Sequence, residues 1–323
     1  MKKIILITGA AGMVGSNLIN KYINKDVQII AIDSLKLGKM DYIKSFKNKK
    51  NFLFFKIDLS KKIKNRKIEN ILKENYLYEV WHLAANSDIQ SGISDYEVDL
   101  NDTFLTTFNT LNFINTYLKK NTKFVFSSSS AIYGNVKGSI SENYKKKSPI
   151  SNYGLMKLLS EEYIEYIANK NNLKTYIFRF PNVLGNNLTH GIIYDFIKKI
   201  RYNKKILNVL GNGDQQKPYS NVLEIIGCMI FIKNKKFLQN VNYFNIGTND
   251  KGIKVRDIVD IFLKESNYGT KAIFQKKKQG WVGDIVNYSY STKKINKLGF
   301  KFKLSSKQVI TKTIKDAIKI NIK

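Results

Sequence analysis

The sequence is poor in the residues that build disulfide scaffolds and metal centres. Its 323 residues include one cysteine, Cys228, and two histidines, His82 and His190. A single cysteine excludes an internal disulfide and favours a reducing, cytoplasmic location. Two histidines are too few for most metal sites, so we expect no metal. No apolar run reaches the roughly 18 residues that a membrane helix needs, and we expect no membrane partner.

Arginine is also scarce, although the chain is strongly basic. The formal net charge is +30, yet only four of the 55 basic residues are arginine. They are Arg66, Arg179, Arg201 and Arg256. Base readout in nucleic acids favours arginine, and basic motifs interleaved with aromatic residues are absent from the sequence. We therefore interpret the charge as a solvated lysine surface and expect no nucleic-acid partner.

The first fifteen residues carry the pattern of a nucleotide-binding turn. Residues 4–7 form an unbroken apolar run, as in a strand buried on both faces. Glycines follow at the spacing G-x-x-G-x-x-G, and the pattern then turns helical. Glycines let the backbone approach a ligand, and a helix N-terminus offers free N–H groups and a positive dipole end. We therefore predict a pyrophosphate site made by Gly9, Gly12, Met13, Val14 and Gly15.

Asp33 follows a second apolar run, residues 27–32. An acid at the end of the second strand can accept both ribose hydroxyls of an adenosine, and it would repel a 2′-phosphate. The position therefore predicts NAD rather than NADP as the cofactor. Lys36 lies close by in the sequence and keeps NADP open.

Two further strand ends point to the same cofactor. Residues 52–57 run into Asp58-Leu59, where the acid is placed to meet an adenine amino group. Residues 80–86 are the fourth expected strand, and its exit carries Leu83, Ala84 and Ala85. Small residues at the carboxyl end of a strand leave room for a cofactor that lies across the sheet. We expect His82, in the same strand, to be a core residue.

Strand and helix patterns alternate along the first half of the chain. We expect further strands at 123–126 and 175–180 and helices at 69–76, 99–118 and 192–200, with residues 246–247 and 255–263 returning to the sheet. Such alternation is typical of an α/β fold with a parallel, doubly wound sheet. We expect a Rossmann domain over residues 1–180, to which segments near 220–250 return. Residues 181–323 would mostly form a smaller α/β lobe for the substrate.

Tyr153 and Lys157 form a candidate pair for proton transfer, because they follow a strand that ends in serines. The fifth expected strand runs into serines 127–130, and Tyr153 and Lys157 follow on an expected helix, four residues apart. A nearby ammonium stabilises a phenolate and lowers the pKa of the tyrosine. The same spacing recurs at Tyr133/Lys137, Tyr166/Lys170, Tyr194/Lys198 and Tyr290/Lys294. Only the Tyr153 pair follows a serine-ended strand at a distance that permits convergence.

Taken in order, these motifs resemble the extended short-chain dehydrogenase/reductase family, and within it the NAD-dependent nucleotide-sugar epimerases and dehydratases. The resemblance covers most of the chain. It implies that Ser129 bonds the reacting sugar hydroxyl, Tyr153 is the base and Lys157 also holds the nicotinamide ribose. Further substrate contacts are implied for Ser130, Asn182, Lys217, Trp281 and Asp284.

The sequence departs from the family at the diphosphate and beside the catalytic serine. Lys217 and Trp281 stand where members often carry arginine, which leaves the identity of the nucleotide open. Ser130-Ala131 stand where 4,6-dehydratases carry an Asp-Glu pair, which argues against dehydration. We therefore expect an enzyme that acts at C4 of a nucleotide sugar, foremost a 4-epimerase. A 4-dehydrogenase that releases the keto sugar and a cofactor-bound protein without turnover remain alternatives.

The helix that carries Tyr153 also predicts self-association. Its apolar residues Leu155, Leu158, Leu159, Tyr163 and Ile167 give it more apolar surface than one sheet contact needs. The resemblance implies pairing through this helix and the one expected at 99–118. We therefore expect a homodimer with a four-helix interface.

Overall fold

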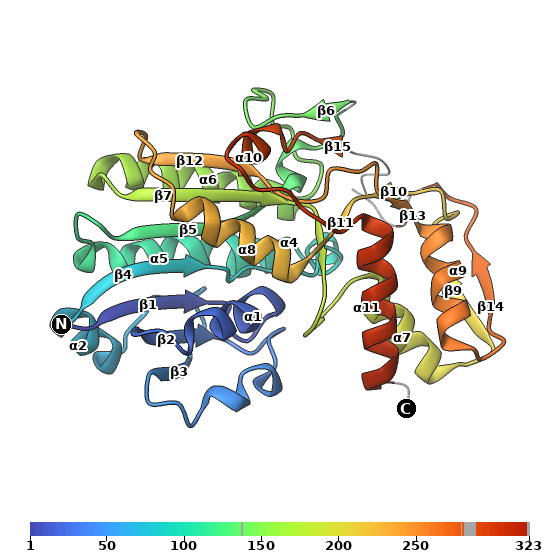
Figure 1. Ribbon diagram of the computed structural model, residues 1–323, viewed down its shortest axis with the longest axis horizontal. Coiled ribbons are helices and arrows are strands. Elements are labelled where there is room, and N and C mark those ends of the chain that lie inside the picture. Colours follow the sequence, from blue (N-terminus) through green and yellow to red (C-terminus); the bar gives the residue numbers. More distant parts are fainter. Residues whose placement is uncertain (137, 279, 281–288, 322–323) are drawn as a thin grey trace.

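A seven-stranded parallel sheet organises the molecule (Figure 1). The computed structural model describes residues 1–136, 138–278, 280 and 289–321. The strand order is β12-β7-β5-β4-β1-β2-β3, and every neighbouring pair is parallel. The strands are Lys3–Thr8 (β1), Gln28–Asp33 (β2), Phe52–Lys56 (β3), Tyr76–His82 (β4), Lys123–Ser129 (β5), Lys174–Phe180 (β7) and Val241–Asn245 (β12). The order reverses between β1 and β4, where doubly wound folds bind dinucleotides.

Helices cover both faces of the sheet, as the alternating pattern predicted. Helices Met13–Tyr22 (α1) and Val222–Lys233 (α8) share one buried apolar cluster with the sheet. Helices Arg66–Glu74 (α2), Thr106–Ile114 (α5) and Asn152–Asn171 (α6) share the cluster on the opposite face. Because apolar side chains are buried on both faces, the strands read as continuous apolar runs. The predicted doubly wound α/β fold is confirmed.

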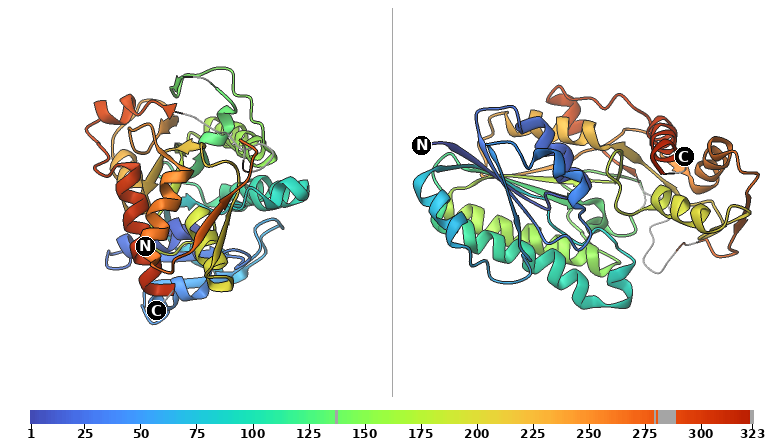
Figure 2. Two further views of the ribbon diagram at one scale, coloured as in Figure 1. Left: turned by 90° about the vertical axis from the view of Figure 1, so that its right-hand side faces the viewer. Right: turned by 90° about the horizontal axis from the view of Figure 1, so that it is seen from below.

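A smaller lobe lies beside the carboxyl ends of the strands (Figures 1 and 2). It contains Ile192–Tyr202 (α7), Val255–Ser266 (α9), Ser306–Asn321 (α11), Ile206–Val209 (β9) and Lys271–Phe274 (β14), which share a separate core. The expectation that residues 255–263 return to the sheet was wrong. The returning segment is α8 followed by β12. Residues 255–263 instead form α9, whose Ile258, Val259 and Phe262 are buried in the small-lobe core.

The remaining elements are short. Three two-stranded pairs are Asn182–Leu184 (β8) with Tyr219–Asn221 (β11), Gln216–Lys217 (β10) with Ile253–Lys254 (β13), and Ser139–Ile140 (β6) with Ser289–Tyr290 (β15). Short helical turns are Met40–Tyr42 (η1), Lys44–Phe46 (η2), Ser91–Ser94 (α3), Tyr96–Asp99 (α4), Asn115–Tyr117 (η4), Ser130–Tyr133 (η5) and Lys293–Lys297 (α10).

Two predicted boundaries were wrong around β4 and α5. Tyr76 begins β4 rather than ending α2, and β4 stops at His82 rather than at residue 86. The expected helix at 99–118 is broken into α4, a π-helical stretch at Leu100–Leu105 (η3), α5 and η4. The spacing of apolar residues does not distinguish an α-helix from a π-helical or 3-10 segment, because each of these keeps one apolar face towards the core.

His82 is a core residue, as predicted. Its side chain is fully buried, with Nδ1 2.8 Å from the Thr8 hydroxyl and Nε2 3.0 Å from the Thr107 hydroxyl. Burial lowers its pKa to about 3, so the ring stays neutral at physiological pH. Among the described residues, no helix is both long enough and apolar enough to cross a membrane.

Candidate active site

A single cavity of about 590 Å³ brings together the predicted cofactor and substrate residues. It lies at the carboxyl ends of the strands, against the small lobe. The predicted residues that line it are Gly9, Gly12, Met13, Val14, Gly15, Asp33, Asp58, Leu59, Leu83, Ala84, Ala85, Ser129, Ser130, Tyr153, Lys157, Asn182 and Lys217. The predicted substrate residues Trp281 and Asp284 lie outside the described residues.

The glycine loop is too tight for side chains at two of its positions. A Cβ atom at Gly15 would lie 2.2 Å from the Gly9 carbonyl oxygen. Gly9 has φ +66°, and a Cβ there would lie 2.7 Å from the backbone nitrogen of Ala84. Gly12 caps the N-terminus of α1 with its backbone alone. The loop therefore presents bare backbone and a helix N-terminus to the cavity, which fits a dinucleotide pyrophosphate.

Asp33 is held by two backbone N–H groups at the rim of the cavity. Its Oδ2 accepts from Ala11 N at 2.9 Å and its Oδ1 from Leu35 N at 2.8 Å. Burial raises the pKa of Asp33, and the two N–H groups oppose that rise. The fixed carboxylate suits two adjacent ribose hydroxyls, since each oxygen retains a lone pair.

Lys36, which kept NADP open, is engaged elsewhere. Its ammonium lies 2.6 Å from Asp102 Oδ1 and 3.4 Å from Asp58 Oδ2. Ser60 also bonds the Asp58 carboxylate through its backbone N–H and its hydroxyl. The pKa of Asp58 is lowered by the hydrogen bonds from Ser60 and by Lys36, against the effect of burial. The positive charge nearest to Asp33 in sequence is thus balanced by two carboxylates.

Tyr153, Ser129 and Lys157 meet at one wall of the cavity. Ser151 caps α6, its hydroxyl accepting from Gly154 N at 3.1 Å, and so fixes the first turn that carries Tyr153. Ser129 lies close enough to the Tyr153 hydroxyl to lower its pKa. The Lys157 ammonium donates to Ser127 O at 2.6 Å and lies 5.9 Å from the centroid of the Tyr153 ring. The convergence inferred from the sequence context is therefore present.

The pKa of Tyr153 is not lowered, contrary to the prediction. Burial raises it to about 12, with the Ser129 hydrogen bond lowering it and Asp99 raising it. Burial also lowers the pKa of Lys157 to about 7, against the carboxylates of Glu161 and Asp99. Desolvation disfavours both charged forms, a cost that spacing along a helix does not reveal. The phenolate therefore needs a further positive charge in the cavity.

A buried polar network fixes the serine strand end behind these residues. Ser128 Oγ donates to Glu161 Oε1 at 2.5 Å, and Arg179 Nη2 donates to Glu161 Oε2 at 2.6 Å. Arg179 Nη1 also donates to the Tyr133 hydroxyl, which donates to Asn245 Oδ1 at 2.7 Å. Tyr133 is therefore a core residue and is not placed to act as a base.

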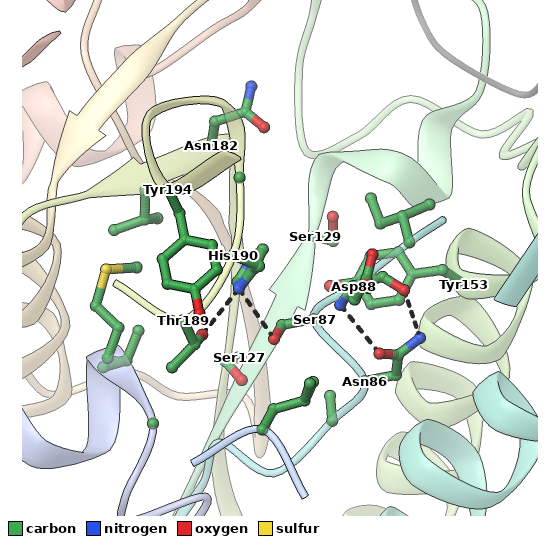
Figure 3. Close-up of a pocket in the computed structure, with 18 of the residues that line it drawn as sticks. Asn86, Ser87, Asp88, Ser127, Ser129, Tyr153, Asn182, Thr189, His190 and Tyr194 are labelled. Atoms are coloured by element: carbon green, nitrogen blue, oxygen red, sulfur yellow. Dashed lines mark hydrogen bonds between the residues drawn. The ribbon is translucent and has the colours of Figure 1, made fainter. Parts of the chain in front are cut away.

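Tyr194 and Lys198 also line the cavity, which the sequence did not indicate. They lie on α7, on the small-lobe side. Figure 3 shows Tyr194 beside Thr189, across the cavity from Ser129 and Tyr153. Because Tyr153 lies beside Ser129 and Lys157, whereas Tyr194 lies across the cavity from them, Tyr153 remains the better candidate base.

Sequence reasoning missed the loop that follows β4. Asn86 Nδ2 donates to Asp99 Oδ1 at 2.8 Å and to Asp88 O at 2.9 Å, and Asp88 N donates back to Asn86 Oδ1 at 3.0 Å. Asn86, Ser87 and Asp88 consequently form one wall of the cavity (Figure 3). Their position at the carboxyl end of a central strand was the available signal.

A second missed segment follows β8. Thr189 and His190 enter the cavity opposite Ser87 (Figure 3). His190 had been considered only as a metal ligand. Among the described residues, no group of three or more His, Cys, Asp or Glu could hold a metal ion.

The glycine loop, the fixed acid and the Ser–Tyr–Lys set at one sheet edge define an oxidoreductase of the short-chain dehydrogenase/reductase class. Residues 5–247 match the model of the NAD dependent epimerase/dehydratase family. The match spans more than half of the chain, so the protein belongs to this family of enzymes, and its cofactor is NAD.

Known proteins resemble the chain over nearly its whole length. A Methanocaldococcus jannaschii protein assigned as a UDP-glucose 4-epimerase is 27% identical, over 96% of this chain and 97% of its own. The crystal structure of a UDP-galactose 4-epimerase is 26% identical, with a TM-score of 0.83, covering 98% of this chain and 99% of that one. The UDP-glucuronic acid 4-epimerase of Bacillus cereus, solved with UDP-glucuronic acid and NAD, shares the fold at 23% identity and a TM-score of 0.84, covering 98% and 99%.

The position of Asp33 predicts selectivity between the two nicotinamide cofactors. We expect NAD⁺ to bind more tightly than NADP⁺, because the 2′-phosphate would meet a buried carboxylate while Lys36 is engaged by Asp58 and Asp102. Calorimetric titration with both nucleotides, together with identification of any nucleotide that co-purifies, measures this preference. Equal or tighter binding of NADP⁺ would contradict it.

Proposed function

We propose that the protein is an NAD-dependent nucleotide-sugar 4-epimerase that works on a UDP-sugar through a 4-keto intermediate. The observation that carries the proposal is the convergence of Ser129, Tyr153 and Lys157 in one cavity that is shared by the cofactor loop and the small lobe. The relatives that resemble the chain along nearly its whole length support the choice of reaction and of the uridine nucleotide.

The chain's own residues supply the proton chemistry. Tyr153 takes the proton of the C4 hydroxyl, and Ser129 holds the same oxygen in line with the phenol. When held by the glycine loop and Asp33, NAD⁺ would supply the hydride acceptor for C4 and a positive charge near the Tyr153 phenolate, and the 4-keto sugar would rotate so that hydride returns to its other face. Tyr153 then gives the proton back to the opposite epimer. Lys157 stabilises the phenolate form while its own amine is protonated.

Net dehydration is disfavoured by the residues after the catalytic serine. Ser130 and Ala131 line the cavity and carry no acid or base that titrates near neutral pH. Elimination across C5 and C6 would need such a pair. Product analysis on a panel of UDP-, GDP- and dTDP-sugars, with absorbance of NADH followed in parallel, tests the proposal. The 4-epimer should form without accumulation of NADH. Accumulation of NADH with a 4-keto product would instead establish a 4-dehydrogenase.

We expect Lys217 to supply much of the positive charge that binds the substrate diphosphate. It lies on β10, lines the cavity and is half-buried. Loss of a charge-assisted contact costs about 1.5–3 kcal/mol, so Lys217→Ala should raise KM for the nucleotide sugar by roughly 10- to 150-fold. NAD⁺ affinity should barely change, because the glycine loop holds the cofactor's pyrophosphate separately. Lys217→Arg should restore the KM only in part, since the head group is larger and planar.

Initial-rate kinetics and calorimetry with NAD⁺ measure both effects. Lys254, the exposed neighbour across the β10–β13 pair, provides a matched control, and Lys254→Ala should leave KM unchanged. The assignment fails if Lys217→Ala leaves KM unchanged while Lys198→Ala or Lys199→Ala raises it.

We propose a homodimer built on α5 and α6, which lie side by side on one outer face (Figure 2). Exposed apolar side chains gather on these helices and the π-helical stretch before them: Leu100, Phe108, Leu155, Leu159 and Tyr166 are 36–61% exposed. Leu158, Tyr163 and Ile167, which the sequence added to this surface, instead pack partly against the protein's own core. The five exposed side chains are the apolar surface that a second copy would cover.

Light scattering should therefore give twice the monomer mass at micromolar concentration. Leu159→Lys should shift the protein towards the monomer, because the new charge would be buried at the two-fold contact. Leu238→Lys, at a fully exposed leucine away from these helices, is the control and should leave the mass unchanged. A wild-type monomer would contradict the proposed assembly.

A further inference from the structure

His190 is the second of the two histidines, and the family match does not explain its environment. It lies between β8 and α7, lines the cavity and is half-buried. Figure 3 shows its ring between Thr189 on the small-lobe side and Ser87 on the opposite wall. The other histidine, His82, is enclosed in the core, so His190 is the histidine that a ligand can reach.

Two hydroxyls lie at the same ring nitrogen of His190. Nδ1 lies 2.9 Å from the Thr189 hydroxyl and 3.3 Å from the Ser87 hydroxyl. Both hydroxyls can donate to Nδ1, and in that arrangement a neutral ring keeps its proton on Nε2; this is the tautomer on which the inference below depends. Burial lowers the pKa of His190, against the charge of Asp88, and this favours the neutral form. Within the described residues, Nε2 has no hydrogen-bond partner.

The segment that carries His190 is anchored on both sides of it. The Asn187 side-chain amide donates to Ser16 Oγ at 2.9 Å, and the Tyr42 hydroxyl donates to Leu188 O at 2.7 Å. Ser87, on the opposite wall, follows Asn86, which Asp99 holds in place. The ring therefore presents Nε2–H in a fixed direction before any ligand arrives, which reduces the entropy lost on binding.

We propose that His190 is a substrate-binding residue whose Nε2–H donates a hydrogen bond to an acceptor oxygen of the nucleotide sugar. The inference rests on the proposed function and adds a recognition residue to it. Ser87 and Asp88 face the ring from the loop after β4, Thr189 lies beside it, and Asp195 lies on the first turn of α7. A neutral donor among these carboxylates suits an uncharged sugar hydroxyl, and a phosphate oxygen offers the same acceptor chemistry.

Nuclear magnetic resonance of the NAD-loaded enzyme, labelled with ¹⁵N at histidine, tests this directly. Two histidines give two pairs of ring nitrogen signals, and the pair from His82 serves as an internal control. We expect His190 to be the Nε2–H tautomer, and we expect UDP-glucose or UDP-N-acetylglucosamine to shift its Nε2 signal while leaving His82 unchanged. A shift with UDP alone assigns the acceptor to the diphosphate, and a shift only with the sugar nucleotides assigns it to the sugar.

Calorimetry on the same samples distinguishes failure of the proposed function from failure of the inference about His190. If no nucleotide sugar binds, the proposed function falls, and the inference falls with it. If a nucleotide sugar binds and the His190 signal does not move, only the inference is overturned. An Nδ1–H tautomer would overturn it as well, and so would a signal that responds to NAD⁺ but not to the sugar nucleotide.

A matched pair of variants gives a kinetic test. The amide nitrogen of glutamine reaches the place of the imidazole Nε2, whereas that of asparagine reaches only the place of Nδ1. His190→Asn should raise KM by roughly 2- to 13-fold, the effect of one neutral hydrogen bond, and His190→Gln should retain most of the affinity. NAD content and kcat should not change in either variant. Equal losses in both variants, or a loss in kcat alone, would contradict the proposed contact.

Discussion

Replacement of Tyr153 by phenylalanine is expected to lower turnover by about 10²- to 10⁴-fold, with NAD still bound. The change removes the phenol hydroxyl beside Ser129 and keeps the ring at the cavity wall. No proton acceptor then remains in line with Ser129, so the C4 hydroxyl must lose its proton to water. Steady-state kinetics give the turnover, and nucleotide release on denaturation gives the NAD content.

Tyr194 provides the matched control, because it lines the same cavity and also precedes a lysine by four residues. Tyr194→Phe should change kcat by less than about 10-fold. The assignment of the base is wrong if Tyr153→Phe turns over at a near-normal rate, and a large loss in Tyr194→Phe would then identify the alternative base.

Replacement of Lys157 by methionine is expected to lower turnover by about 10- to 10³-fold, because an opposite charge nearby shifts a pKa by about 1–3 units. Methionine keeps the length of the buried side chain and loses the charge. The ammonium that donates to Ser127 O would also be lost, so we expect weaker binding of NAD. Kinetics and a cofactor titration measure the two effects separately.

The loss of turnover in Lys157→Met should depend on pH in a definite direction. A positive charge favours the phenolate and lowers the pKa of Tyr153, so the acid limb of the kcat/KM profile should move to higher pH in Lys157→Met. The pKa of Lys157 is about 7, so its charge is present below pH 7 and is lost as the pH rises above it. The ratio of wild-type to variant activity should thus be largest below pH 7. A ratio that grows with pH would contradict this role.

The sheet was predictable because its sequence signals are local and agree with one another. The apolar runs before Gly9 and Asp33 are too short for helices, and a helical pattern separates them. Residues 255–263 were misplaced because their periodicity is helical but does not state which core the helix joins. Tyr76 was assigned to the preceding helix because a tyrosine fits the apolar face of either element.

Site residues that end or directly follow a strand could be predicted from the sequence. Site residues on loops that fold back to the cavity could not. Asp33, Ser129 and Asn182 each end or follow a strand, so the topology places them at one edge. Asn86 and His190 act through hydrogen bonds to residues distant in sequence, Asp99 and Ser87, and no spacing encodes those contacts. The raised pKa of Tyr153 likewise depends on burial, which only the assembled fold determines.

The fate of the hydrogen at C4 tests the central claim most directly. The nucleotide sugar that is turned over would be prepared with deuterium at C4, and its epimer isolated after many turnovers. If Tyr153 moves only the hydroxyl proton and NAD returns the same hydride, deuterium should remain at C4 of both epimers, and none should reach solvent. Deuterium in the solvent, or on released NADH beside a 4-keto product, would contradict epimerisation at this site.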